Sequence, residues 1–74
     1  MTPFDVKLAR KIRTKRAESG LTARALALRM GVNPGQVYSW ENCRYSPAAF
    51  NLCLLADEFG CTVDELLGRG DDDG

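Results

Sequence analysis

The chain has 74 residues, of which 45% are hydrophobic and 27% are charged. This length allows one compact domain with a small core, and it leaves hardly any room for a second domain or a deep catalytic pocket. The composition excludes wholesale disorder, and no stretch has the roughly 18 consecutive apolar residues that would span a bilayer.

The charges are unevenly distributed, although the formal net charge is zero. Residues 1–44 hold nine Lys or Arg and three acids, which leaves +6. Residues 45–74 hold one Arg and seven acids, which leaves −6. A basic end can meet phosphate while an acidic end faces away, but a solvated basic helix and an unrelated acidic tail explain the same pattern.

The cysteine and histidine content of the sequence does not favour a metal site or a disulfide. The three cysteines, Cys43, Cys53 and Cys61, have no C-x-x-C spacing, and there is no histidine. A zinc site or a disulfide framework is therefore not expected. The N-terminus also lacks the cationic and apolar regions of a secretory signal. We expect reduced thiols, two of them partly buried, in a cytoplasmic protein that needs no cofactor.

Capping residues predict where the helices begin. The first helix is predicted to begin with Thr2 as its N-cap and Pro3 at its first position. Apolar residues then recur at intervals of four, which marks one face of a helix, and Gly20 ends it. Thr22 is expected to cap a second, shorter helix over residues 23–30.

Two further helices are predicted to begin with a polar residue and a proline. Asn33 caps the third helix, which covers residues 34–42 and has a proline at its first position. Ser46 and Pro47 repeat that pattern, so a fourth helix is predicted from there to Phe59. Both starts combine an N-cap oxygen with a backbone angle that already suits a helix.

The remaining sequence completes an all-α domain. Thr62 and Glu65 form a capping box that predicts a brief fifth helix. No segment alternates apolar and polar residues as a strand does. With short connections throughout, the sequence predicts a compact five-helix domain over residues 1–68, followed by a flexible acidic tail over residues 69–74.

Residues 22–42 have the properties of a helix-turn-helix unit. Ala27 is small enough for the crossing point of two helices, and Gly31 can adopt a positive φ where the chain reverses. Val37 and Trp40 lie three residues apart and are expected to face inward. This leaves the opposite side of the third helix free to enter a major groove.

A series of residues in register carries a resemblance to a known family. They are Gly20-Leu21-Thr22, Leu26-Ala27, Met30-Gly31-Val32, Val37, Trp40-Glu41, Pro47, Leu55-Ala56, Phe59-Gly60 and Asp64-Glu65-Leu66. The pattern resembles the Cro/cI-type helix-turn-helix family, also called XRE or lambda-repressor-like, over roughly residues 4–67. The resemblance implies a five-helix domain that binds duplex DNA, and stand-alone members of this length resemble phage Cro-like regulators.

The resemblance also implies which residues contact DNA. Base edges would be met from the third helix by Pro34, Gly35, Gln36, Tyr38 and Ser39. Phosphates would be met from two helix starts and the following loop by Thr22, Ala23, Asn33, Asn42 and Arg44. The family usually pairs an arginine late in the first helix with the glutamate after the aromatic residue of the third helix. Those positions are Arg16 and Glu41, for which two exposed charges are the alternative.

Several departures from the family pattern limit base recognition. Ala23 stands where relatives often have glutamine, and Pro34 and Gly35 replace polar side chains. Cys43 stands where the family favours glycine. Direct recognition would then depend on Gln36, whose amide can bond adenine N6 and N7 together.

Some apolar and basic side chains have two interpretations. Leu28, Phe50 and Leu54 stand where relatives commonly have polar residues, and the last two share one side of a helix. They form either a partner surface, such as that of a homodimer on DNA, or part of a core against a slightly rotated helix. Three lysines either contact phosphate or belong to a solvated face, namely Lys7, Lys11 and Lys15.

The sequence therefore predicts a non-enzymatic transcription regulator, a repressor of phage or bacterial origin, that uses residues 34–42 in the major groove. Its expected partners are double-stranded DNA and a second copy of the chain, without a membrane, a cofactor or a small-molecule ligand. The alternative is a protein-interaction module or an antitoxin-like component with the same fold. Ala23, Pro34 and Gly35 favour that alternative, because they remove polar side chains from the DNA-facing surface.

Overall fold

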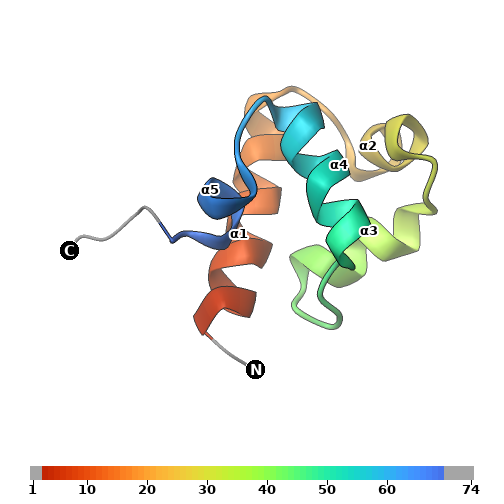
Figure 1. Cartoon of the computed structure of the whole chain (residues 1–74). Coiled ribbons are helices and arrows are strands. Elements are labelled where there is room, and N and C mark those ends of the chain that lie inside the picture. Colours follow the sequence, from red (N-terminus) through yellow and green to blue (C-terminus); the bar gives the residue numbers. More distant parts are fainter. Residues whose placement is uncertain (1–2, 70–74) are drawn as a thin grey trace.

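The computed structural model describes residues 3–69, which form five helices joined by short turns (Figure 1). The helices are α1 (Pro3–Glu18), α2 (Ala23–Met30), α3 (Pro34–Glu41), α4 (Ala49–Phe59) and α5 (Val63–Leu67). Residues 3–69 contain no strand, and the predicted all-α, five-helix fold is confirmed.

The longest helix, α1, is the element against which most of the others pack. It contacts α3, α4 and α5, and α2 contacts both α3 and α4. In Figure 1 the pair formed by α2 and α3 lies on one side of the molecule, and α5 lies against α1 on the other. The arrangement encloses one hydrophobic core between all five helices.

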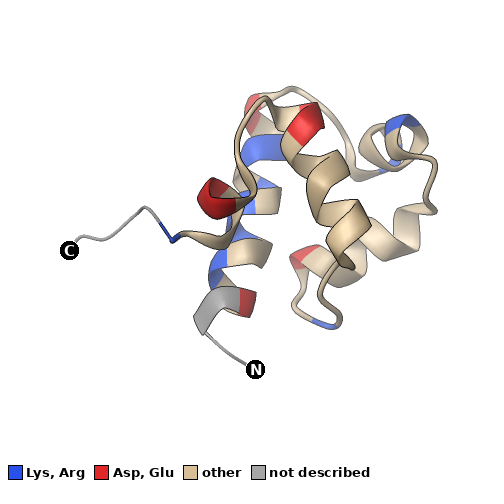
Figure 2. Ribbon diagram, viewed as in Figure 1, with Lys and Arg blue, Asp and Glu red and all other residues tan. Residues whose placement is uncertain are grey.

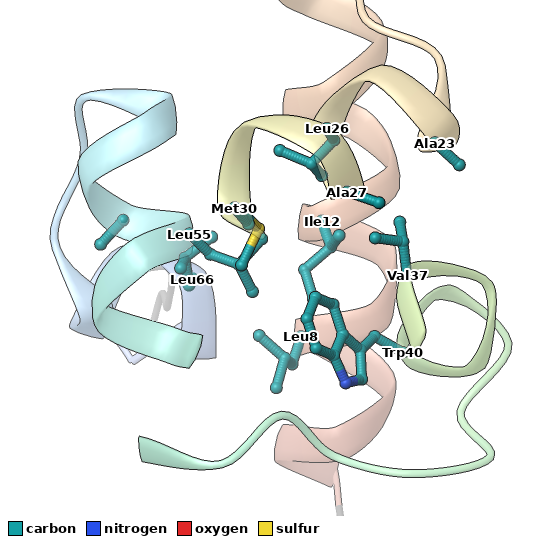
Figure 3. Packing of buried hydrophobic residues seen from close by; sticks show 11 residues of the cluster. Leu8, Ile12, Ala23, Leu26, Ala27, Met30, Val37, Trp40, Leu55 and Leu66 are labelled. Atoms are coloured by element: carbon teal, nitrogen blue, oxygen red, sulfur yellow. The ribbon is translucent and has the colours of Figure 1, made fainter. Parts of the chain in front are cut away.

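Every helix contributes to that core. The largest fully buried side chains are Ile12, Leu26, Val37, Leu55 and Leu66, one from each helix in chain order. The indole ring of Trp40 lies beside Leu8 in the same cluster (Figure 3) and is 4% exposed. Burial of this apolar surface is the main favourable term for so short a chain.

Three predicted helix starts are capped as expected. Thr22, Asn33 and Thr62 precede α2, α3 and α5, and each accepts a backbone N–H of the first turn at 3.0 Å through its side-chain oxygen. These bonds satisfy N–H groups that have no partner within their own helix. Thr2, the predicted cap of α1, lies outside the described residues.

The predicted start of α4 is wrong. The helix begins at Ala49, after Ala48, which makes no side-chain hydrogen bond to the first turn. The Ser46 hydroxyl instead donates to Asp5 Oδ1 on α1 at 2.6 Å, and Pro47 is buried. A contact with a distant part of the chain therefore uses the hydroxyl that the local pattern assigns to a cap.

The last described helix, α5, ends at Leu67. Gly68 closes this helix with a positive φ and is buried, and the Arg69 N–H donates to the Asp64 carbonyl at 3.0 Å. The rest of the predicted tail, 70–74, lies outside the described residues. The boundary between domain and tail stays a prediction.

The three cysteines are unpaired. Cys53 is exposed, whereas Cys43 and Cys61 are partly buried, and burial raises the pKa of the Cys61 thiol above its ordinary value. Within the described part of the chain, no three side chains of the metal-ligating types come together. None of the helices between residues 3 and 69 combines the length and the apolar character needed to cross a membrane.

Candidate nucleic-acid interface

The turn between α2 and α3 is tight and is held by backbone hydrogen bonds. Gly31 ends α2 at a φ of 73°, in the left-handed region that glycine adopts without steric strain. The Val32 N–H then donates to the Ala27 carbonyl at 3.0 Å. Ala27 itself is completely buried, so its small side chain permits the close approach of the neighbouring helix.

One side of α3 is buried and the other is exposed. Val37 and Trp40 are 0% and 4% exposed and belong to the core. The helix ends at Glu41, and Asn42, predicted as its last residue, is the C-cap. The residues predicted to meet base edges all keep exposed surface, namely Pro34, Gly35, Gln36, Tyr38 and Ser39.

The exposed side of α3 carries a shallow hollow. It lies over Gly35, which has no side chain to fill it, and is bordered by Tyr38, Ser39, Asn42 and Arg44. The border thus offers a phenol, a hydroxyl, an amide and a guanidinium group. These groups can donate hydrogen bonds to base edges or to phosphate oxygens.

Most residues predicted to meet phosphates are already hydrogen-bonded within the protein. Thr22 and Asn33 cap helices, and Asn42 Nδ2 donates to a carbonyl of α3 at 2.9 Å. Ala23 is 4% exposed because its methyl group lies in the core, so only its backbone N–H is placed to meet a phosphate. Arg44 is exposed.

The structure brings Arg16 and Glu41 together. Arg16 Nε and Nη2 donate to the two carboxylate oxygens of Glu41 at 2.6 and 3.0 Å, and Nη1 donates to the Leu21 carbonyl at 2.9 Å. The Glu41 side chain is only 5% exposed. The hydrogen bond to Glu41 raises the pKa of Arg16, although burial acts in the opposite direction. This two-pronged bond joins α1 to the end of α3.

A second arginine of α1, Arg13, also bonds to the C-terminal end of α3. The sequence did not lead us to predict this contact. Arg13 Nη2 donates to the Glu41 backbone carbonyl at 3.2 Å and to Asn42 Oδ1 at 3.5 Å. It thereby meets the carbonyl end of α3, where a positive charge is favourable. The available signal was its position three residues before Arg16, which places both on one face of α1.

A comparison with known protein families identifies the family to which this five-helix fold belongs. The family model described as Helix-turn-helix matches residues 12–66. The chain belongs to the helix-turn-helix family of the Cro/cI (XRE) type. Neither a curated protein nor a solved structure shows a significant match to the chain. Because this helix-turn-helix family is a DNA-binding family, the chain carries a DNA-binding domain.

In this helix-turn-helix protein the cations are concentrated away from α3. Figure 2 shows most of the Lys and Arg on α1 and none on α3. Lys15 Nζ lies 3.6 Å from Glu65 of α5, and Arg29 of α2 pairs with Glu58 of α4 at 2.6 Å. The described Lys and Arg therefore lie on α1, on α2 and in the segments after α3, and none lies on α3 itself.

The three apolar residues that depart from the family pattern differ in how far they are buried. Leu28 is 83% exposed and Phe50 is 74% exposed. Leu54 is partly buried and packs against the core. The alternative in which a rotated helix buries these side chains is therefore wrong for Leu28 and Phe50, and it holds in part for Leu54.

Proposed function

We propose that the protein is a sequence-specific transcription regulator, a repressor of phage or bacterial origin that acts on duplex DNA in the cytoplasm. The observation that carries this proposal is the two-sided construction of α3. Its inner side is tied to α1 by the Arg16–Glu41 pair and by Trp40, and its outer side is left exposed. A helix held in this way presents its side chains to a groove at reproducible positions.

In the proposed complex, the outer side of α3 meets base edges in the major groove. Gln36 and Ser39 supply hydrogen-bonding groups, and Tyr38 lies beside them. Pro34 and Gly35 supply only shape and apolar contact, for example with a thymine methyl group. Because few polar groups are available, the shape of the DNA contributes to the remaining sequence preference.

Phosphate contacts come from two helix starts and from the loop after α3. Thr22 and Ala23 at the start of α2, and Asn33 before α3, offer backbone N–H groups at the positive end of a helix dipole. Arg44 adds a cation, and Asn42 adds a polar side chain. These contacts position the protein on the duplex and carry no sequence information themselves.

A second copy of the chain is the proposed partner on DNA. A single module of this size covers one half-site, and two half-sites raise both affinity and specificity. Leu28, Phe50 and Leu54 are the apolar residues proposed for the contact between copies. The exposure of Leu28 and Phe50 supports their assignment to such a surface.

The test is selection of bound duplexes from a randomised library, followed by sequencing. An enriched motif is expected, and symmetry within it would indicate two copies on DNA. Ser39→Ala, on the outer side of α3, is expected to alter the motif. Lys7→Ala, an exposed change on α1, is the matched control and should leave the motif unchanged. Absence of any enriched motif from the folded protein would reject sequence-specific binding.

A protein-interaction module or an antitoxin-like component is the second candidate, and the exposure of Leu28 and Phe50 favours it. The dependence of binding on salt concentration distinguishes the two functions. DNA binding should weaken steeply between about 50 and 200 mM salt if several phosphates are neutralised. A complex built on apolar contacts should hardly respond to salt, and Phe50→Ser should weaken it.

A further inference from the structure

Gln36 carries most of the proposed base recognition, and its side chain already bonds to the protein. Gln36 Oε1 accepts the backbone N–H of Asn33 at 3.2 Å. In return, the Asn33 side chain accepts a backbone N–H of the first turn of α3 at 3.0 Å. The two residues form a capping box at the start of α3.

The capping bond fixes which edge of the Gln36 amide faces outward. The amide is planar, with an acceptor oxygen on one arm and a nitrogen with two donor hydrogens on the other. Oε1 is directed back to the backbone before α3, so Nε2 forms the opposite arm of an exposed side chain. Among the described residues, no hydrogen bond uses Gln36 Nε2.

We infer that the capping bond to Asn33 makes Gln36 a donor-only contact that selects guanine over adenine. This inference rests on the proposed insertion of α3 into the major groove. Guanine presents two neighbouring acceptors there, N7 and O6, whereas adenine presents the acceptor N7 and the donor N6. A two-bond contact with adenine needs both Oε1 and Nε2 turned to the base, and the cap holds Oε1 away.

Asn33 is therefore a positioning residue for base choice as well as a helix cap. Its backbone N–H, and not its side chain, determines the orientation of the Gln36 amide. The two groups can be separated experimentally. Asn33→Ala removes the side-chain cap and keeps the N–H, whereas Asn33→Pro removes both.

The experiment is library selection followed by competition between four duplexes that differ at one base pair. That base pair is the one at which Gln36→Ala abolishes the preference. The wild type is expected to favour guanine over adenine by about tenfold, because adenine keeps the N7 acceptor but replaces the O6 acceptor by the N6 donor. Asn33→Ala should keep this preference. Asn33→Pro should reduce it or shift it to adenine, with circular dichroism confirming that the helices are retained.

Gln36→Glu provides a test that does not depend on the folding of the proline variant. Glutamate at this position keeps an oxygen for the Asn33 N–H and is itself the usual capping-box residue. Its outward arm becomes an acceptor, so the preferred base should change from guanine to cytosine, which presents the N4 donor.

The outcomes separate the inference from the proposed function. A motif with adenine at the position that depends on Gln36 would overturn the inference and leave the function standing. A motif in which no position depends on Gln36 would do the same, and Gln36 would then be a cap only. Absence of any motif from the folded protein would reject sequence-specific binding itself.

Discussion

The two helices α3 and α4 follow the same local signal, a polar residue and a proline, and are held in the fold in different ways. At α3, Asn33 caps the helix, and Pro34 is its first residue. At α4, the Ser46 hydroxyl bonds to Asp5 of α1, and the helix begins two residues after Pro47 without a side-chain cap.

The far ends of the two helices differ as well. The chain leaves α4 through Gly60, at a φ of 65°, where glycine is free of strain. After α3 the corresponding left-handed residue is Cys43, at a φ of 58°, which a side chain disfavours. The end of α3 is instead held by Arg16 and Arg13, which bond to the carboxylate and the backbone carbonyl of Glu41.

These differences show that α3 and α4 are held in the fold by different kinds of interaction. α3 is joined to α1 by directional polar bonds at its C-terminal end and has a side-chain cap at its start, whereas α4 lacks such a cap and buries apolar side chains such as Leu55. Hydrogen bonds define direction, and hydrophobic burial does not. In the proposed complex, the helix that presents side chains to DNA is the one whose C-terminal end is held by polar contacts as well as by burial.

The largest effect is expected from removing the buried pair at the end of α3. Arg16→Met leaves the Glu41 carboxylate, which is 5% exposed, without its main partner, and should lower the free energy of unfolding by about 3 kcal/mol. Urea denaturation measures this. Combining Arg16→Met with Glu41→Met should recover much of the loss, because no unpaired charge then remains.

Arg13→Met is the matched control for that prediction. The Arg13 side chain is 59% exposed, and its Nε lies 4.0 Å from the Glu41 carboxylate. A loss of less than about 1 kcal/mol is expected, as for other exposed charges. Equal losses for Arg13→Met and Arg16→Met would contradict the assignment of the buried pair as the main anchor of α3.

The second prediction compares the contributions to stability of the polar residues at the starts of α3 and α4. Asn33→Ala removes the side-chain cap of α3 and should lower the free energy of unfolding by about 1 kcal/mol. Ser46→Ala removes an exposed bond to Asp5 that water can replace, and should lower it by about 0.5 kcal/mol, the low end for a hydrogen bond. Thermal or urea unfolding measures the loss of stability in both variants. A larger loss for Ser46→Ala than for Asn33→Ala would contradict the conclusion that the cap of α3 contributes more than the Ser46–Asp5 bond.

A missing cap can be added to α4. Ala48 has the extended backbone of an N-cap, with φ −63° and ψ 160°, but offers no acceptor. Ala48→Ser should therefore raise the free energy of unfolding by roughly 0.5–1 kcal/mol. Ala49→Ser, one residue inside the helix, is the control and should bring no gain; an equal gain there would indicate an effect unrelated to capping.

The last prediction concerns the left-handed residues that follow α3 and α4. Cys43→Gly removes backbone strain but also the thiol contact with the Asp5 carbonyl at 3.4 Å, so a gain of about 0.5 kcal/mol is expected. Gly60→Ala introduces the same strain after α4 and should lose about 1 kcal/mol. Unfolding midpoints measure both, and a stabilising Gly60→Ala would show that strain at these turns is unimportant.

Much of the fold followed from short-range patterns. The caps at Thr22, Asn33 and Thr62, and the turn at Gly31, depend on neighbouring residues, so the sequence was sufficient to predict them. The inward side of α3 followed from the spacing of Val37 and Trp40. The site could be predicted only in part, because the use of each polar group depends on which competing partner lies within reach.

The sequence by itself determined the number of helices, the capped starts of three of them, the tight turn and the exposed side of α3, because capping, glycine geometry and apolar spacing act over a few residues. Only the tertiary structure decided that the Ser46 hydroxyl bonds to α1, that Arg13 joins Arg16 at the end of α3, and that Leu54 is partly buried while Phe50 is exposed. These outcomes depend on contacts between residues far apart in the chain, and a local pattern does not specify which of several available partners a polar or apolar group will meet.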